Sequence, residues 1–253
     1  MLKHRVIPCL LLRNRGLVKT LKFANPKYVG DPINAIRIFN EKEVDELLVL
    51  DIEASKTKRE PDYDLIEQFA GECFMPLTYG GGITTVDQAK RLFTIGVEKV
   101  SIQTSAINDL KLVSEIASRY GNQSVVVSID IKKNMLGRQK LYCASSGKVL
   151  DQDWHQFMTQ AVAAGAGEIL LTSVDRDGTM SGMDILLIET AARSCPVPLI
   201  AAGGVGSLMD MKKAVTAGAS AVAAGAFFVY HGPRRAVLIT YPKYNELIAL
   251  LDS

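Results

Sequence analysis

The stretch Pro76–Ile83, PLTYGGGI, returns in altered form as Pro198–Val205, PLIAAGGV, a displacement of 198 − 76 = 122 residues. The same displacement carries Glu46 onto Glu168. In each copy an apolar run ends in a glycine pair, which is typical of a buried strand followed by a tight turn. Two fused halves explain the shared register, because each half alone would leave a sheet edge open and an inner face wet.

Around these two copies, short apolar or β-branched runs alternate with amphipathic stretches, a pattern typical of βα units around a parallel sheet. The apolar runs are Arg5–Leu12, Glu46–Asp51, Pro76–Tyr79, Lys99–Ile102, Ser124–Ile131, Glu168–Ser173, Leu199–Ala202 and Ala221–Gly225. The amphipathic stretches include Tyr63–Glu72, Val86–Ile95, Leu110–Tyr120, Trp154–Ala164, Ile185–Ser194 and Leu208–Ala217. Eight strands alternating with helices imply a closed sheet. The sequence therefore predicts the α/β class and a single (β/α)8 TIM barrel domain over residues 1–253, made of two fused half-barrels.

The segments that connect the predicted strands and helices contain residues typical of helix caps, hairpins and loops. Thr85 and Ser207, each followed three residues later by Gln or Asp, predict capping boxes at two helix starts. The segment Lys132–Leu150 is polar and punctuated by glycine, which favours a small hairpin. The segment Arg13–Gly30 has the character of a long mobile loop after the first strand. Long βα loops of a barrel usually belong to its active face.

Composition excludes several classes of protein. The chain has 29 basic and 27 acidic side chains and no basic run longer than a pair, so it offers no nucleic-acid footprint. Its 48% of apolar residues fit a globular domain with a large core. No apolar stretch is long enough for a bilayer and no signal peptide is recognisable, so we expect a cytoplasmic protein without a membrane partner. The four scattered cysteines indicate free thiols rather than disulfides or a metal site, and no cofactor is expected.

Each half places a glycine turn after its third strand and small or hydroxyl residues after its fourth. Glycines let backbone N–H groups approach an anion closely, and barrels commonly bind phosphate after their last two strands. The repeat therefore predicts two facing phosphate sites. Their residues are Gly81, Gly82 and Thr104 in the first half, and Gly203, Gly204, Gly225 and Ala226 in the second. The alternative is that the glycines only make tight turns, which a single pair would favour.

Carboxylates also fall at strand ends on the predicted active face. Asp51 ends the second strand, Asp130 ends the fifth, and Asp175 and Asp177 follow the sixth. Such groups can act as general acids or bases in a dry site, and their alternative role is helix capping or ion pairing. We favour catalysis for Asp130 and a structural role for Asp175.

The remaining charged candidates lie at opposite ends of the barrel. Lys19 lies in the long loop after the first strand, where it could close over an anionic substrate, and a solvated surface lysine is the alternative. Four other charged residues start strands one, two, four and six, so their side chains can converge at the bottom of the barrel. They are Arg5, Glu46, Lys99 and Glu168. A salt-bridged ring of this kind is most simply a structural plug.

Several motifs resemble the cyclase subunit of imidazole glycerol phosphate synthase, and the match runs nearly end to end. The motifs are Ile7–Leu10, Asp45–Leu47, Leu50–Ile52, Gly80–Ile83, Lys99–Ile102, Gly167–Ser173 and Asp175–Thr179. In that family a glutaminase subunit docks at the bottom of the barrel, and ammonia travels through the barrel to a doubly phosphorylated ribonucleotide at the top. The resemblance thus implies a heterodimer with a glutaminase and a phosphorylated small-molecule substrate.

The resemblance also implies a role for each candidate residue. The bottom charges become the gate to the ammonia channel: Arg5, Glu46, Lys99 and Glu168. The active-site residues become Lys19, Asp130, Thr172 and Asp177. The phosphate sites include Gly82, Thr104, Gly204, Gly225 and Ala226.

The chain departs from the family pattern at four positions. The family's cyclase uses two aspartates, and Leu11 stands in the place of the first, so half of the acid–base pair is absent. Gln103 replaces the usual Asn. Ala202 and Ala226 stand where hydroxyl residues are usual, which removes side-chain donors from a phosphate pocket.

The segments Leu17–Phe23 and Tyr28–Pro32 are similar to a divergent subfamily associated with acetamidino sugars of bacterial surface polysaccharides. That subfamily works beside its own glutaminase and a sugar amidotransferase. The resemblance implies a subunit that accepts ammonia and supports amidine formation on a sugar. An authentic histidine-pathway cyclase and a non-catalytic scaffold that activates the glutaminase are the two alternatives. Leu11 argues against the former, whereas Asp130 and the glycine pairs argue against the latter.

Overall fold

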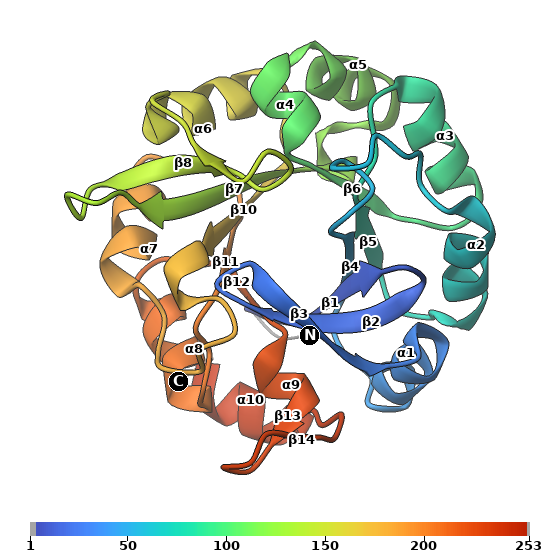
Figure 1. The fold of residues 1–253 in the computed structure, drawn as a ribbon, viewed down its shortest axis with the longest axis vertical. Helices are drawn as coiled ribbons and strands as arrows, with labels where there is room; N and C mark the ends of the chain where they lie inside the picture. The colour runs from blue at the N-terminus through green and yellow to red at the C-terminus, as the bar shows by residue number, and fades with distance from the viewer. Residues whose placement is uncertain (1–3, 252–253) are drawn as a thin grey trace.

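Eight parallel strands pair in a closed circle in the computed structural model, which describes residues 4–251 (Figure 1). In order around the circle they are β1 (Arg5–Arg13), β4 (Leu47–Asp51), β5 (Leu77–Gly80), β6 (Lys99–Ile102), β7 (Val125–Lys133), β10 (Glu168–Ser173), β11 (Leu199–Ala202) and β12 (Ala221–Ala224). The last strand pairs with the first, with Arg5 opposite Ala221. The predicted (β/α)8 barrel and its eight strands are confirmed.

Helices form a ring around these strands (Figure 1). The longer ones are α1 (Pro32–Glu41), α2 (Tyr63–Glu72), α3 (Val86–Thr94), α5 (Lys111–Tyr120), α6 (Trp154–Ala163), α7 (Ile185–Ala192), α8 (Leu208–Thr216) and α10 (Tyr244–Leu251). Two short helices, α4 (Thr104–Asn108) and α9 (Ala226–Val229), follow β6 and β12. The capping box of Thr85 is confirmed in both directions. Ser207 also caps its helix, whereas the Asp210 carboxylate accepts from the preceding Gly206 N–H.

The long loop predicted after the first strand is wrong, because residues 16–30 form a hairpin. Its strands are β2 (Gly16–Leu21), which pairs antiparallel with β1, and β3 (Ala24–Gly30). The turn between them is made by Lys22 and Phe23, both in the left-handed region with φ of 53° and 61°. A hairpin turn with two positive φ values usually has Asn or Gly at its central positions, and neither residue type occupies positions 22 and 23.

The hairpin predicted within residues 132–150 is confirmed. Its strand β8 (Gln139–Cys143) pairs antiparallel with β7, and β9 (Lys148–Val149) pairs with β8. Each half-barrel therefore extends its first strand into an antiparallel hairpin at the carboxyl end. Both hairpins rise on the face where the βα loops lie.

The duplication is visible in the contacts of the glycine turns. A Cβ on Gly81 would lie 2.5 Å from the carbonyl oxygen of Asp51, and one on Gly203 would lie 2.6 Å from that of Ser173. The two obstructing residues are themselves 173 − 51 = 122 positions apart. Both turns thus pack against the same point of the preceding strand end, which requires glycine.

Side chains inside the barrel are arranged in layers with a period of two residues. One apolar layer consists only of strand residues: Ile7, Leu48, Val126, Leu170, Ile200, Ala221 and Ala223. A larger core between sheet and helices contains the fully buried Phe39, Phe69 and Phe157. Because side chains alternate along a strand, residues two positions before and two positions after the inner layer also point inward. In the described part of the chain, no helix is long and apolar enough to cross a membrane.

The tight glycine packing makes a stability prediction. A Cβ on Gly204 would lie 2.2 Å from the Gly182 carbonyl oxygen, whereas Gly137, also at positive φ, has nothing within 4 Å of that position. Both Gly204→Ala and Gly137→Ala incur the left-handed cost of roughly 1–2 kcal/mol, and only the former adds a clash. Thermal melts should therefore show the larger drop for Gly204→Ala, at roughly 2–4 °C per kcal/mol. Equal melting temperatures would contradict the packing argument.

Candidate functional site

A cavity of about 420 Å³ opens at the carboxyl ends of the strands. Most of the candidate residues line it: Lys19, Gly81, Gly82, Thr104, Asp130, Thr172, Asp177, Gly203 and Gly225. Gly204 and Ala226 do not. Gly204 lies behind Gly203 against Gly182, and the Ala226 side chain is buried at the start of α9.

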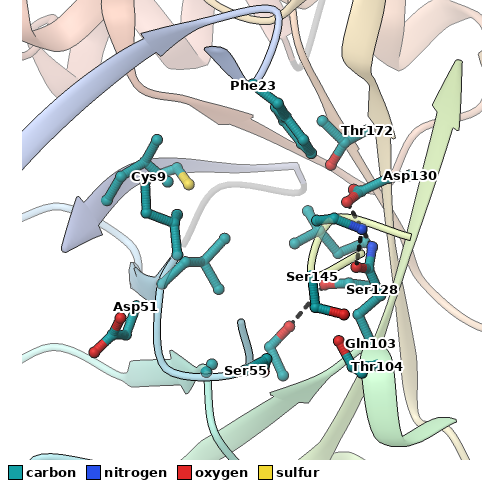
Figure 2. Close-up of a pocket in the computed structure, with 18 of the residues that line it drawn as sticks. Cys9, Phe23, Asp51, Ser55, Gln103, Thr104, Ser128, Asp130, Ser145 and Thr172 are labelled. Carbon is teal, nitrogen blue, oxygen red and sulfur yellow. Dashed lines mark hydrogen bonds between the residues drawn. The ribbon is translucent and has the colours of Figure 1, made fainter. Parts of the chain in front are cut away.

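Asp130 lies on the wall formed by β7, where it is 6% exposed (Figure 2). Its carboxylate accepts hydrogen bonds from the side chains of Gln103 and Thr172. Burial raises the pKa of Asp130 to about 7, although these two hydrogen bonds act in the opposite direction. A carboxyl group with a pKa near neutrality can both give and take a proton at physiological pH.

Two hairpins, residues 16–30 and residues 132–149, cover the cavity and form its roof. Gln103 connects the Asp130 carboxylate to this roof. Its amide nitrogen donates to Asp130, and its amide oxygen accepts the backbone N–H of Ala144 at 3.0 Å. Ala144 begins the turn that connects β8 to β9, and this turn also lines the cavity. Sequence reasoning missed the contribution of this turn, although its Ser-Ser-Gly composition at 145–147 marked it as polar.

Leu11 occupies the position in the first half that Asp130 occupies in the second. Leu11 pairs with Leu50 across β1 and β4, and Asp130 pairs with Thr172 across β7 and β10. The two partners are 172 − 50 = 122 residues apart, which is the displacement of the repeat. Leu11 also lines the cavity. The side chain equivalent to Asp130 is therefore apolar and transfers no proton.

The wall around Leu11 is correspondingly apolar. It includes Cys9 and Leu50, and Figure 2 shows Cys9 on the side of the cavity opposite Asp130. Burial raises the pKa of the Cys9 thiol to about 12, so this group stays protonated at neutral pH. The cavity thus has one polar and one apolar wall.

Lys19 is a buried residue of the hairpin and not a solvated surface lysine. Its ammonium lies 3.0 Å from Asp177, and the neighbouring Thr20 hydroxyl donates to the same carboxylate at 2.8 Å. The backbone carbonyl of Asp177 accepts the N–H of Lys22. Asp177 therefore fixes the β2–β3 hairpin over the cavity through three contacts.

The two hairpins meet above the cavity. Phe23 at the tip of the first contacts Tyr142 of the second, edge to face, with ring centroids 6.1 Å apart. Both aromatic residues line the cavity, and neither was predicted from the sequence. They close part of its mouth with apolar surface.

The other two aspartates have structural roles. Asp51 pairs with Arg59 at 2.9 Å and accepts the N–H groups of Glu53 and Ala54. Asp175 accepts the backbone N–H of Lys133 at 2.8 Å, which ties the β7–β8 hairpin to the loop after β10. The structural role expected for Asp175 is thus observed, with Lys133 as its partner.

The four charges at the bottom of the barrel form a ring. Lys99 lies 3.0 Å from Glu46 and 3.2 Å from Glu168, and Arg5 contacts the same two carboxylates. Thr78 donates to Glu46 at 2.8 Å. Two cations and two anions therefore compensate one another, as buried charges require.

The fold and site define a (β/α)8 barrel with a charge ring at one end and a polar cavity at the other. A family profile described as histidine biosynthesis protein matches residues 5–233. The chain belongs to this family, and within it to the barrel subunits similar to the cyclase of imidazole glycerol phosphate synthase. Membership of this family supports the interpretation that the chain is a subunit of an enzyme.

Three relatives illustrate the range of similarity. A Pseudomonas aeruginosa protein provisionally named imidazole glycerol phosphate synthase subunit hisF2 is 53% identical over 98% of this chain and 99% of its own. A provisionally named subunit HisF of Leptospira interrogans is 49% identical over 99% of each chain. The imidazole glycerol phosphate synthase subunit HisF of Streptococcus sanguinis is 39% identical over 90% of this chain and 91% of its own.

The raised pKa of Asp130 predicts a pH-dependent stability. Its unfolded-state pKa is about 4 and its folded-state pKa about 7, so the folded state holds the proton more tightly. The free energy of unfolding should then fall as pH rises between these values, by at most about 1.4 kcal/mol per unit. Asp130→Asn removes this term, so melting temperatures at pH 5 and pH 8 should show the variant gaining on wild type at the higher pH. Parallel pH profiles would refute a raised pKa.

Proposed function

We propose that this chain is the ammonia-accepting subunit of a heterodimer with a glutaminase, and that it supports amidine formation on a sugar for surface polysaccharide (O-antigen) biosynthesis. The observation that carries the proposal is the combination of an intact charge ring with Leu11 in the position equivalent to Asp130. The intact ring favours an ammonia supply like that of the imidazole glycerol phosphate synthase cyclase. Leu11 favours a reaction that differs from the one this cyclase catalyses.

The bottom of the barrel supports the partnership with a glutaminase. Phe74 lies there, in the connection between α2 and β5, and is 86% exposed. Large exposed apolar residues are typical anchors of protein interfaces. In this proposal Arg5, Glu46, Lys99 and Glu168 form the gate that ammonia passes.

The barrel interior supports passage of a neutral molecule. Above the ring lies the apolar layer that includes Ile7, Leu48 and Leu170, followed by the cavity. An apolar interior disfavours ammonium, because burying an unpaired charge is costly, and tolerates uncharged ammonia. The hydroxyls of Ser101 and Ser128, 2.8 Å apart, offer hydrogen bonds where this route meets the cavity.

The cavity supports a phosphorylated small-molecule substrate. Asp130 is the proposed general acid–base group, and Thr172 hydrogen-bonds its carboxylate. Lys19 and Asp177 are proposed to fix the hairpin over the bound substrate. The glycine turns 81–82 and 203–204, with Thr104, Gly225 and Ala226, are the proposed phosphate positions. A sugar amidotransferase is the proposed second protein partner in amidine formation.

A second candidate is an authentic cyclase of histidine biosynthesis, which the Streptococcus relative's name favours. It requires another group to replace the missing aspartate, and Asp177 and Asp51 are both engaged in ion pairs. A scaffold that only activates the glutaminase would need neither the cavity nor Asp130. These observations favour the first proposal.

The glutaminase partnership is tested by two exposed apolar residues at opposite ends of the barrel. Phe74→Ala should weaken association with the cognate glutaminase about tenfold or more, because a large desolvated anchor is lost. Met135→Ala, fully exposed at the tip of the β7–β8 hairpin, is the control and should leave the Kd unchanged. Binding titration and glutaminase turnover measure both effects. A glutaminase that neither binds nor gains activity would overturn the proposal.

The changed reaction is tested by turnover with ammonia and the histidine-pathway nucleotide. Loss of one member of an acid–base pair typically removes about 10²–10⁴ in rate, or roughly 3–5 kcal/mol of barrier lowering. Wild type should therefore turn over poorly, Leu11→Asp should raise the rate, and Asp130→Asn should abolish what remains. Wild-type turnover like that of an ordinary cyclase would promote the second candidate.

A further inference from the structure

Near its C-terminus the chain forms a small hairpin on the outside of the barrel. The strands of this C-terminal hairpin are β13 (Tyr230–His231) and β14 (Ala236–Val237), which lie beside α9 and α10 (Figure 1). The family profile ends at residue 233, so β14 and the residues after it lie beyond the matched part of the chain. Arg235 belongs to this part, and its side chain reaches back to the loop that contains Asp177.

Arg235 binds the loop that follows β10. One terminal nitrogen of its guanidinium donates to the Gly178 carbonyl at 3.2 Å, and the other donates to the Thr179 carbonyl at 3.0 Å. A planar guanidinium can bind two neighbouring carbonyls at once, whereas an ammonium group is a single point of charge. Within residues 4–251 no carboxylate forms an ion pair with Arg235, so the loop is its main partner.

The backbone of Arg235 adopts a conformation that disfavours arginine. Its φ of 51° lies in the left-handed region, where Cβ comes too close to a carbonyl oxygen. Its N–H donates to the Gly232 carbonyl at 3.0 Å, which closes a four-residue turn. Glycine would occupy this position without the steric cost. Because such strain persists only where other contacts offset it, an arginine here favours a role for its side chain.

The loop that Arg235 binds also holds the β2–β3 hairpin. The Asp177 carboxylate accepts the Thr20 hydroxyl at 2.8 Å, and the Asp177 carbonyl accepts the Lys22 N–H at 2.9 Å. A Cβ on Gly178 would lie 2.1 Å from the Thr20 carbonyl oxygen, so the two backbones are in direct contact. Arg235 and the β2–β3 hairpin therefore bind adjacent residues of one loop.

The residues after β14 attach the C-terminal hairpin to the barrel independently of this loop. The N–H of Thr240 donates to the Phe228 carbonyl at 2.9 Å. The Tyr241 hydroxyl donates to the Val6 carbonyl of β1 at 3.0 Å. Because the segment that carries it is anchored to the barrel, the Arg235 side chain can restrain the loop that it binds.

We infer that Arg235 is a positioning residue, which holds the 177–179 loop in place and thereby fixes the β2–β3 hairpin over the cavity. Arg235 does not line the cavity and acts through Asp177. The inference rests on the proposed function only for the substrate that the hairpin would cover. It also assigns a role to a segment that the family profile does not match.

Hydrogen exchange resolved to single amides tests the inference on the purified full chain. Arg235→Ala should raise the exchange rate of the Lys22 amide about tenfold, because this N–H is bonded to the loop that Arg235 restrains. The Ala144 amide, which is bonded to Gln103 in the other hairpin, should exchange as in wild type. Arg235→Lys keeps the charge and one donor group, so it should restore part of the protection.

Two further variants separate the Arg235 side chain from its backbone and from its charge. Arg235→Gly removes the guanidinium together with the steric cost of a positive φ. It should therefore raise Lys22 exchange as Arg235→Ala does, while melting at or above the temperature of that variant. Arg234→Ala removes a neighbouring exposed cation and should exchange like wild type.

Unchanged Lys22 exchange in both Arg235→Ala and Arg235→Gly would overturn the inference. So would an equal rise in Arg234→Ala, no recovery in Arg235→Lys, or a rise that includes Ala144 and the barrel strands, since the effect would then be global. Binding and activation of the glutaminase at the other end of the barrel test the proposed function separately. Failure of that activation with a retained Lys22 effect would refute the proposed function and leave the inference standing.

Discussion

Pairing of β12 with β1 closes the sheet, and the rest of the molecule depends on this closure. A closed parallel sheet has no free edge, and it brings the carboxyl ends of all eight strands to one rim. Because side chains alternate with period two, the same strands present Arg5, Ile7 and Cys9, or Glu168, Leu170 and Thr172, at successive depths. The charge ring, the apolar layer and the cavity are thus three levels of one inner surface.

The duplicated backbone builds the barrel and its cavity. Side chains that differ between the two halves determine the chemistry of the cavity. The backbone places Leu11 and Asp130 in equivalent registers, yet one side chain is inert and the other titrates near neutrality. The displacement of 122 residues (226 − 104 = 122) relates Thr104, which lines the cavity, to Ala226, which does not line it. A symmetric pair of half-sites would bind a symmetric ligand. Side-chain differences between the halves therefore make the two sides of the cavity chemically different.

The sequence predicted the features that depend on local pattern. Strands followed from apolar runs, the charge ring followed from residues at strand starts, and the cavity residues followed from strand ends. The β2–β3 hairpin was missed because Lys22 and Phe23 adopt positive φ values without Asn or Gly. Contacts between distant segments, such as Gln103 with Ala144, carry no sequence signal, because only the closed barrel brings them together.

The two roof hairpins are held by the groups that the proposed chemistry uses. Asp177 binds Lys19 and Thr20 of the first hairpin, and Gln103 joins Asp130 to the turn after the second. Asp130 is buried in the wall of the cavity under this roof, and desolvation is the main cause of its raised pKa. An opened roof would admit water and return the carboxyl toward its ordinary acidity. The contacts that hold the two hairpins over the cavity therefore involve the same side chains, Asp130 and Asp177, that the proposed chemistry uses.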